Sequence, residues 1–154
     1  LVRGPNVFKG YWKMPEKTAE DFTAQGFFKT GDKAKIDADG YVSIVGRSKD
    51  MIITGGLNVY PKEIELIIDD IQGVKESAVI GVHHKDFGEA VVAIVICSDS
   101  SALKEIDVIE YCKQHLAGYK IPKKVIFANE LPRNTMSKVQ KNILRESYKN
   151  SFNL

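Results

Sequence analysis

The chain has 154 residues, of which 44% are hydrophobic and 27% are charged, and its formal net charge is +2 at pH 7. These values are typical of an ordinary globular protein with one sizeable core, and the small net charge argues against a general binder of polyanions. No apolar run reaches the length of about 18 residues that a membrane-spanning helix needs, and no signal peptide is recognisable.

Cysteine and histidine usage points away from metal chemistry. The spacing of Cys97 and Cys112 fits neither a disulfide framework nor a zinc site. Both lie in apolar segments, as is typical of buried thiols in a reducing compartment. His83 and His84 end a predicted strand, where paired histidines are more often surface residues than ligands, and His115 lies late in a predicted helix, where a cation suits the helix dipole. We expect no metal ligand and no catalytic histidine.

The first 48 residues consist of short apolar pieces separated by turn signals. Residues 18–22 predict a brief helical turn with Thr18 as its cap. The sequence Asp37-Ala-Asp-Gly40 precedes the strand-forming segment Tyr41–Val45 and therefore predicts a hairpin. A calcium loop is excluded there because the remaining ligand positions are absent. This part of the chain is expected to be a small β unit.

The stretch from residue 46 to residue 65 marks a change in pattern, from short strand-like pieces to longer alternating segments. It contains a charged turn, a short apolar run, the pair Gly55-Gly56 and Pro61, which fits the first position of a helix that ends before Gly73. The isoleucines that follow recur at helical spacing and are expected to face a core: Ile64, Ile67, Ile68 and Ile71.

Strand and helix patterns alternate through the rest of the chain. Residues 74–82, 89–96 and 124–128 predict strands, and residues 103–116 predict a helix. The side chains expected to face inward from that helix are Ile106, Ile109, Cys112 and Leu116. The sequence Ser137-Lys-Val-Gln140 is a capping-box pattern and predicts a last helix that runs to about Lys149. Three strands interleaved with three helices predict a compact α+β domain of about 100 residues.

Several polar features are candidates for chemistry. Asp32 follows a glycine turn, where a carboxylate accepts hydrogen bonds from a vicinal diol such as ribose, although such aspartates more often serve the turn itself. Arg47 and Lys49 lie at the change in pattern, and a guanidinium binds sugar oxygens or carboxylates bidentately. The pair Gly55-Gly56 permits either a close backbone approach to a ligand or a tight turn.

Lys138 is the fourth candidate. It is expected in the first turn of the last helix, where the helix dipole disfavours a cation. An anion bound by the backbone N–H groups and the ammonium would offset that cost and make a phosphate site. The alternative is an exposed lysine that belongs to a solvated basic face, together with the other late cations: Lys120, Lys123, Lys124, Arg133 and Lys141.

Taken together, these residues resemble the C-terminal portion of the adenylate-forming superfamily, which contains acyl-CoA synthetases, peptide-synthetase adenylation domains and luciferases. Three motifs match in the family's order: Phe28–Asp32, Gly46-Arg-x-x-Asp50 with Gly56 and Glu63-Ile-Glu65, and Leu131–Lys138. The resemblance extends over essentially the whole chain. Within this superfamily the sequence is most similar to malonyl-CoA synthetases, in four segments: Gly4–Trp12, Ile53–Glu63, Lys120–Phe127 and Asn134–Arg145.

The resemblance implies a fold and a reaction. Residues 49–154 would be the lid domain, α+β with a small three-stranded sheet and packed helices, and residues 1–48 an all-β remnant of the large AMP-binding domain. The implied enzyme is an acid–thiol ligase. It uses ATP and Mg²⁺ to convert a carboxylic acid, expected to be malonate, into acyl-AMP, and it then transfers the acyl group to CoA.

The resemblance also implies roles for single residues. Asp32 would hold the ribose hydroxyls, assisted by Arg47, and Lys49 would be the hinge about which the lid rotates between the two steps. Lys138 would bridge oxygens of the carboxylate and the α-phosphate in the first step. The loop Gly55-Gly56 would approach the pantetheine arm of CoA, and no residue is assigned to a metal.

Ser137 is the one departure from the family pattern, because glycine usually stands immediately before the catalytic lysine. A serine has less backbone freedom than a glycine, although its hydroxyl suits a helix cap. The substitution therefore bears on how well Lys138 is placed for adenylation.

The family's phosphate loop and acyl pocket lie in the large domain and not in these residues, so we expect the chain by itself to be an inactive fragment. Its expected partners are a carboxylic acid, ATP, CoA and the missing N-terminal domain, with no nucleic acid and no membrane. Unpaired strand edges in residues 1–48 favour self-association. The expected location is the cytoplasm, with mitochondria or plastids as alternatives in a eukaryote.

Two other functions stay open at this point. One is a ligase or adenylation domain for a fatty or other acid, because the acid pocket is absent from the sequence. The other is a non-catalytic α+β module that binds an anionic partner through the late basic cluster. A salt-sensitive affinity for oligonucleotides would favour that module.

Overall fold

The structure is a computed structural model that describes residues 1–98 and 102–152. The chain forms two compact units, Leu1–Ile44 and Val45–Leu154, and each is described by itself. None of the helices in the described ranges combines the length and the apolar character that crossing a membrane requires.

An aromatic cluster organises the first unit. The rings of Phe8, Phe22 and Phe28 lie with their centroids 5.1 to 5.4 Å apart, within the range in which aromatic pairs attract. Helix α1 (Pro15–Asp21) ends beside this cluster and begins with Pro15, whose fixed φ suits the first helical position. The predicted helical turn at residues 18–22 is therefore part of a helix that begins three residues earlier.

The predicted hairpin is confirmed. Strands β1 (Asp32–Ile36) and β2 (Val42–Arg47) form a two-stranded sheet. In the turn between them, Asp37 Oδ1 accepts hydrogen bonds from the N–H groups of Asp39 (3.1 Å) and Tyr41 (2.8 Å). Gly40 takes a φ of +88°, which favours glycine.

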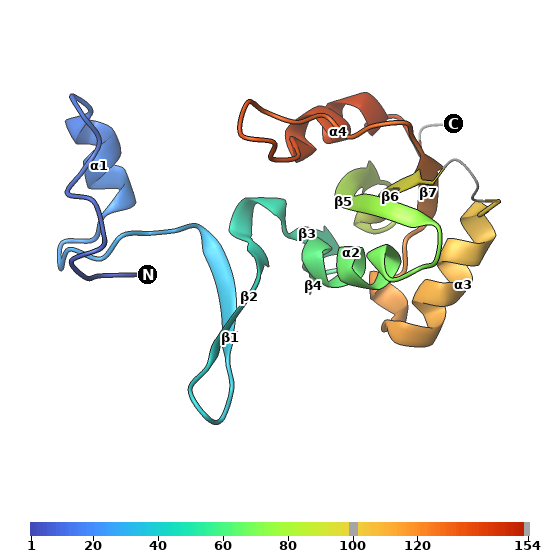
Figure 1. The fold of residues 1–154 in the computed structure, drawn as a ribbon, viewed down its shortest axis with the longest axis horizontal. Coiled ribbons are helices and arrows are strands. Elements are labelled where there is room, and N and C mark those ends of the chain that lie inside the picture. The colour runs from blue at the N-terminus through green and yellow to red at the C-terminus, as the bar shows by residue number, and fades with distance from the viewer. Residues whose placement is uncertain (99–101, 153–154) are drawn as a thin grey trace. The chain divides into compact units, whose positions relative to one another are not determined.

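The second unit is built on a five-stranded sheet whose central strand is β6 (Figure 1). One edge of β6 (Gly88–Cys97) pairs antiparallel with β5 (Val74–His84) along nearly its whole length. The other edge pairs antiparallel with β3 (Ile52–Thr54) at Gly88 and parallel with β7 (Lys124–Phe127) from Val92 to Val95. Strand β4 (Leu57–Val59) continues the sheet beyond β3.

The α+β class and the three predicted strands are confirmed, but the sheet has five strands and not three. The additional strands, β3 and β4, have three residues each and are joined by Gly55-Gly56. Strands this short do not show the period-2 pattern by which strands are recognised in a sequence.

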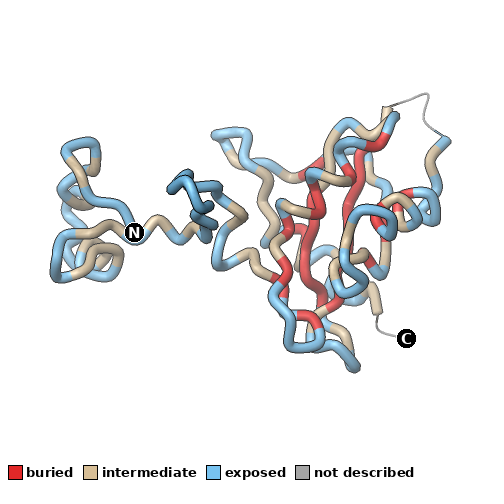
Figure 2. Tube along the Cα trace, turned by 90° about the horizontal axis from the view of Figure 1, so that it is seen from below, coloured by how far each residue is buried: buried red, intermediate tan, exposed pale blue. Residues whose placement is uncertain are grey.

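Helices cover both faces of this sheet, so its central strands are buried on both sides (Figures 1 and 2). Helices α2 (Pro61–Asp69) and α3 (Glu105–His115) pack on one face, where β6 contributes Val91, Ala93 and Val95. Helix α4 (Lys141–Tyr148) packs on the other face, where β6 contributes Val92, Ile94 and Ile96. This double burial explains the nearly continuous apolar run of β6. Two short 3-10 helices, η1 (Ser48–Asp50) and η2 (Gly118–Lys120), complete the unit.

The expected inward face of α3 is partly wrong. Cys112 is fully buried as predicted, but Ile106 is 53% exposed and Val108 is fully buried in its place. The helix is rotated because Glu105 turns toward the sheet, where its Oε1 accepts a hydrogen bond of 2.7 Å from the N–H of Val125 in β7. Tertiary contacts of this kind override the apolar periodicity of a weakly amphipathic helix.

The two cysteines differ in their surroundings. Both are free thiols, and Cys112 is buried whereas Cys97 is only partly buried. Desolvation raises the pKa of the Cys112 thiol to about 11, so this side chain acts as a small apolar core residue.

The predicted start of the last helix is wrong. Helix α4 begins at Lys141, four residues after the expected cap, and Ser137 has a φ of +59°. Residues 134–138 instead form a tight loop closed by two backbone hydrogen bonds, from Ser137 N–H to the Asn134 carbonyl (2.9 Å) and from Asn134 N–H to the Lys138 carbonyl (3.0 Å). A loop of this pattern needs a left-handed residue at its end, which is incompatible with the extended backbone of a helix cap.

The cation in the first turn of α4 is therefore Lys141 and not Lys138, and the protein itself supplies its anion. The Lys141 ammonium forms an ion pair with Glu65 of α2, and the side chains are only 16% and 8% exposed. Glu65 Oε1 also accepts a hydrogen bond of 3.0 Å from the N–H of Val79 in β5. This carboxylate thus links α2, β5 and α4.

We predict that Lys141→Met lowers the free energy of unfolding of the second unit by roughly 3 kcal/mol, because Glu65 stays buried without its counter-charge. The measurement is urea denaturation followed by circular dichroism, because the single tryptophan, Trp12, lies in the first unit. The control is Lys62→Met, whose ammonium lies 3.9 Å from Glu65 on a side chain that is half exposed. The control should change stability by less than about 0.5 kcal/mol, and equal effects of the two variants would contradict the prediction.

A second prediction concerns the left-handed residue Ser137. Ser137→Gly should raise the free energy of unfolding by about 0.5–1 kcal/mol, because relief of the left-handed strain exceeds the added chain entropy of glycine. The matched control Ser147→Gly, inside α4, should instead lower stability by about 0.5 kcal/mol, because glycine has a lower helix propensity than serine. The same denaturation experiment compares them, and a loss of stability in both variants would show that Ser137 is unstrained.

Candidate functional site

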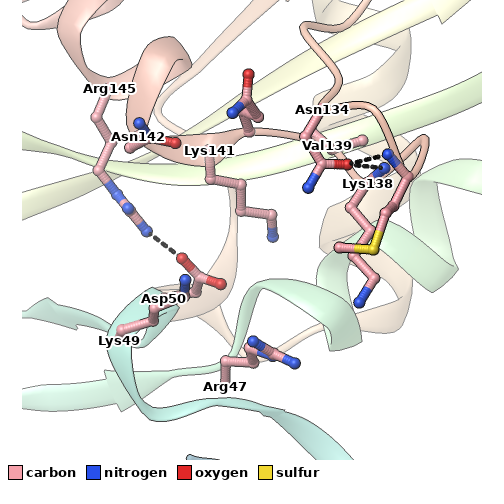
Figure 3. A pocket seen from close by; sticks show the side chains of 11 residues that line it. Arg47, Lys49, Asp50, Asn134, Lys138, Val139, Lys141, Asn142 and Arg145 are labelled. Carbon is pink, nitrogen blue, oxygen red and sulfur yellow. Dashed lines mark hydrogen bonds and ion pairs between the residues drawn. The ribbon is translucent and has the colours of Figure 1, made fainter. Parts of the chain in front are cut away.

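A pocket of about 570 Å³ lies in the second unit, between the segment around η1 and the chain that leads into α4 (Figure 3). Its lining carries five cationic side chains against one carboxylate, a balance that suits an anionic ligand. The lining residues are Arg47, Lys49, Asp50, Asn134, Met136, Lys138, Val139, Gln140, Lys141, Asn142 and Arg145.

Three of the predicted site residues line this one pocket. Arg47 is the last residue of β2, Lys49 is the middle residue of η1, and Lys138 is the last residue of the tight loop before α4. Lys138 is therefore about ninety residues away from the other two in the sequence but shares a cavity with them. The motifs that suggested these residues separately thus converge in space.

A loop with its own hydrogen bonds holds the backbone of Lys138. The Oδ1 atom of Asn134 accepts hydrogen bonds from the N–H groups of Met136 and Lys138, both at 3.0 Å, as the dashed lines in Figure 3 show. An asparagine that bonds backbone groups two and four residues ahead stabilises a turn without a helix. Lys138 consequently projects from a hydrogen-bonded loop and not from the first turn of α4.

Arg145 and Lys141, two of the lining cations, form ion pairs within the unit. Arg145 of α4 pairs with Asp50 of η1 at 2.8 Å, and both side chains point toward each other across the pocket (Figure 3). Lys141 pairs with Glu65. In residues 1–98 and 102–152, by contrast, no hydrogen bond or ion pair engages the ammonium of Lys49 or Lys138. These two ammonium groups are available to a ligand.

The pair Gly55-Gly56 lies outside the lining of this pocket. It forms the turn between β3 and β4, with φ values of +57° and +79°. Positive φ at both central residues is what a type I′ hairpin turn requires, so the turn alone accounts for both glycines. A Cβ atom added at either position would meet no atom within 4 Å, which leaves open space beside the turn.

Asp32 belongs to the first unit, as the first residue of β1. Its N–H donates a hydrogen bond of 3.2 Å to the hydroxyl oxygen of Thr30, so the backbone of the glycine turn is fixed locally. The predicted role of its carboxylate in ribose binding stays a prediction.

The sequence did not suggest a role for Asp50, Asn134 or Arg145, although the first two lie in the family motifs Gly46-Arg-x-x-Asp50 and Leu131–Lys138. An asparagine four residues before the lysine is a recognisable turn signal and would have argued against a helix cap at Ser137. The pair of Asp50 and Arg145 spans 95 residues of sequence, and no local pattern reveals it.

A known family matches the part of the chain that contains the loop at residues 134–138. Residues 63–138 match the family described as AMP-binding enzyme C-terminal domain. The match ends at Lys138 and contains both Glu65 and the loop at residues 134–138.

Curated relatives are ligases. The chain is 48% identical over 149 residues to the 3-[(3aS,4S,7aS)-7a-methyl-1,5-dioxo-octahydro-1H-inden-4-yl]propanoyl:CoA ligase of Rhodococcus jostii, covering 97% of this chain and 29% of that protein. It is 47% identical over 148 residues to the long-chain-fatty-acid–CoA ligase FadD13 of Mycobacterium tuberculosis, covering 96% of this chain and 29% of that protein. The chain thus spans about three tenths of the length of these relatives.

A solved structure shares the fold at higher identity. ATP-bound MatB from Rhodopseudomonas palustris matches with a TM-score of 0.89 and 59% identity, over 97% of this chain and 30% of that chain. Sequence and fold therefore agree, and residues 63–138 belong to the AMP-binding enzyme C-terminal domain family.

Proposed function

We propose that the chain acts as the C-terminal portion of an AMP-forming acid–CoA ligase, with residues 49–154 as the lid and residues 1–48 as the end of the large AMP-binding domain. The observation that carries this proposal is the ammonium of Lys138. It projects from a hydrogen-bonded loop into a cationic pocket, and no group in the described part of the chain neutralises it. Such a cation suits a reaction in which negative charge accumulates on phosphate oxygens.

In the first step, a carboxylate oxygen of the acid attacks the α-phosphorus of ATP, the bond to the β-phosphate breaks, and pyrophosphate leaves. Lys138 would contact oxygens of both reacting groups, reduce their mutual repulsion and stabilise the charge of the transition state. Asp32 and Arg47 would hold the ribose hydroxyls of the nucleotide.

In the second step, the sulfur of CoA attacks the acyl carbon and AMP leaves. The open space beside the Gly55-Gly56 turn supports an approach of the pantetheine arm there, since any Cβ would project into it. Mg²⁺ would accompany ATP. Within the described ranges no group of three or more histidine, cysteine, aspartate or glutamate side chains could hold a metal ion, so we assign no magnesium ligand to this chain.

Malonate is the acid that we propose. The chain is 59% and 60% identical to the ATP-bound and apo structures of the malonyl-CoA synthetase MatB, compared with 47% to the fatty-acid ligase FadD13. A fatty acid is the alternative, supported by the latter match. The partners would be the acid, ATP, CoA and the large domain, and the cytoplasm would be the site of action.

Lys49 is the proposed hinge residue, and the ion pair of Asp50 with Arg145 supports this position. Because that pair fastens residue 50 to α4, a rotation of the lid has to take place before residue 50. Lys49 is the adjacent residue, and its ammonium has no partner in the described part of the chain that would oppose a change in its backbone.

These roles can be tested in a hybrid ligase, in which this chain replaces the matching 30% of MatB. We predict that Lys138→Ala lowers acid-dependent release of pyrophosphate by about 100-fold or more, because the transition-state charge loses its cation. Thioester formation from supplied acyl-AMP should stay close to that of the unmodified hybrid.

The matched control for this experiment is Lys113→Ala, which removes an exposed lysine of α3 that forms an ion pair with Glu110 on the same helix. The control should leave both steps unchanged. A similar loss of both steps in Lys138→Ala would refute the assigned role.

We further predict that Lys49→Pro slows thioester formation several-fold more than it slows pyrophosphate release, because proline fixes the φ angle that the rotation needs to change. Lys49→Ala, which removes the ammonium but keeps the backbone freedom, should leave the ratio of the two rates unchanged. The hinge assignment fails if Lys49→Pro impairs pyrophosphate release more strongly.

A further inference from the structure

The peptide group between Ser137 and Lys138 is held at both ends by side chains of its own loop. Its N–H donates to Asn134 Oδ1 at 3.0 Å, and its carbonyl oxygen accepts a hydrogen bond of 2.7 Å from Nη1 of Arg133. This peptide plane sets the direction in which the side chain of Lys138 leaves the backbone. A rotation of the plane would move the ammonium by several ångströms, since the lysine side chain is long.

Arg133 is itself anchored to the sheet. Its Nη2 atom forms an ion pair with Oε2 of Glu76 in β5, while Nη1 binds the Ser137 carbonyl. The planar guanidinium therefore bridges strand β5 and the loop. An isolated β-bridge between Arg133 and Val139 and a hydrogen bond of 2.8 Å from Gln140 N–H to the Pro132 carbonyl keep the base of the loop closed.

The bridge through Arg133 stabilises the left-handed conformation of Ser137. A serine at a φ of +59° is less stable there than a glycine, so the loop has a tendency to leave this conformation. The bond from Arg133 to the Ser137 carbonyl and the bond from Lys138 N–H to Asn134 both oppose that change.

We propose that Arg133 is a positioning residue for Lys138. Together with Asn134, Arg133 locks the Ser137–Lys138 peptide and so directs the ammonium of Lys138 into the pocket. This inference rests on the proposed function only for the reaction that Lys138 assists. The lock, meaning the bonds of Arg133 and Asn134 to the Ser137–Lys138 peptide, is present in the chain itself. Arg133 acts through Lys138 and does not line the pocket.

The lock can be measured without any activity, by NMR relaxation of the 154-residue chain. In Arg133→Met the amide order parameters of Ser137 and Lys138 should fall from about 0.85 to about 0.6 or lower, while those of β5 and β6 stay unchanged. Arg133→Lys should give intermediate values, because one ammonium cannot reproduce the two-pronged contact to Glu76 and the carbonyl. Unchanged order parameters in Arg133→Met would overturn the lock.

The positioning role is measured in the hybrid ligase. Arg133→Met should lower kcat for pyrophosphate release between about 10- and 100-fold with little change in the KM for ATP, and it should spare thioester formation from supplied acyl-AMP. Lys113→Met, which removes a cation of similar exposure away from the loop, should change neither step. Normal pyrophosphate release in Arg133→Met, beside its loss in Lys138→Ala, would overturn the positioning role.

The two proposals fail in different ways. If Lys138→Ala retains pyrophosphate release, the proposed function is wrong, whereas the order parameters of Arg133→Met still decide whether the lock exists. If Arg133→Met reduces both half-reactions equally, the arginine stabilises the fold and does not position the lysine.

Discussion

The buried carboxylate of Glu65 is the contact on which the second unit depends. It receives the N–H of Val79 from β5 and the ammonium of Lys141 from the first turn of α4, and it stands on α2. Because a buried charge without a partner is costly, the position of α4 against the sheet is tied to this one group. Only two residues, Val139 and Gln140, separate the loop at residues 134–138 from α4, so the same contact restricts where Lys138 can lie.

A second ion pair connects α4 to the segment beside the proposed hinge. Asp50 and Arg145 join η1 to α4, on the same helix that Glu65 holds. The segment from residue 50 onward, α4 and the lysine loop are thereby connected through charged contacts between groups of low exposure, which are stronger than surface pairs. Lys49 stands directly before this connected body. The arrangement supports a lid that moves as a unit and carries an already oriented lysine, with Arg47 and Lys138 facing one cavity.

The sequence was a good guide wherever local pattern and burial agree. The run of apolar residues in β6 and Pro61 at the start of α2 predicted those elements correctly, because double burial and the fixed φ of proline leave few alternatives. It was misleading at α3, where a distant contact decides: Glu105 turns the helix so that Val108 replaces Ile106 in the core. It was also misleading at Ser137, whose left-handed conformation belongs to a local turn at Asn134 and replaces the expected helix cap. Of the site, the motifs indicated Arg47, Lys49 and Lys138, but not the bond from the backbone of Lys138 to Asn134 or the ion pair of Asp50 with Arg145 beside Lys49.

The most direct test of the central claim, that this chain is the moving C-terminal portion of an acid–CoA ligase, compares the hybrid ligase with MatB that ends where the replaced segment begins. Both would be given malonate, ATP and CoA, and pyrophosphate and malonyl-CoA would be quantified together. The account predicts that the hybrid forms both products in equal amounts and that the shortened MatB forms no malonyl-CoA. A folded hybrid that forms no more of either product than the shortened protein would contradict it.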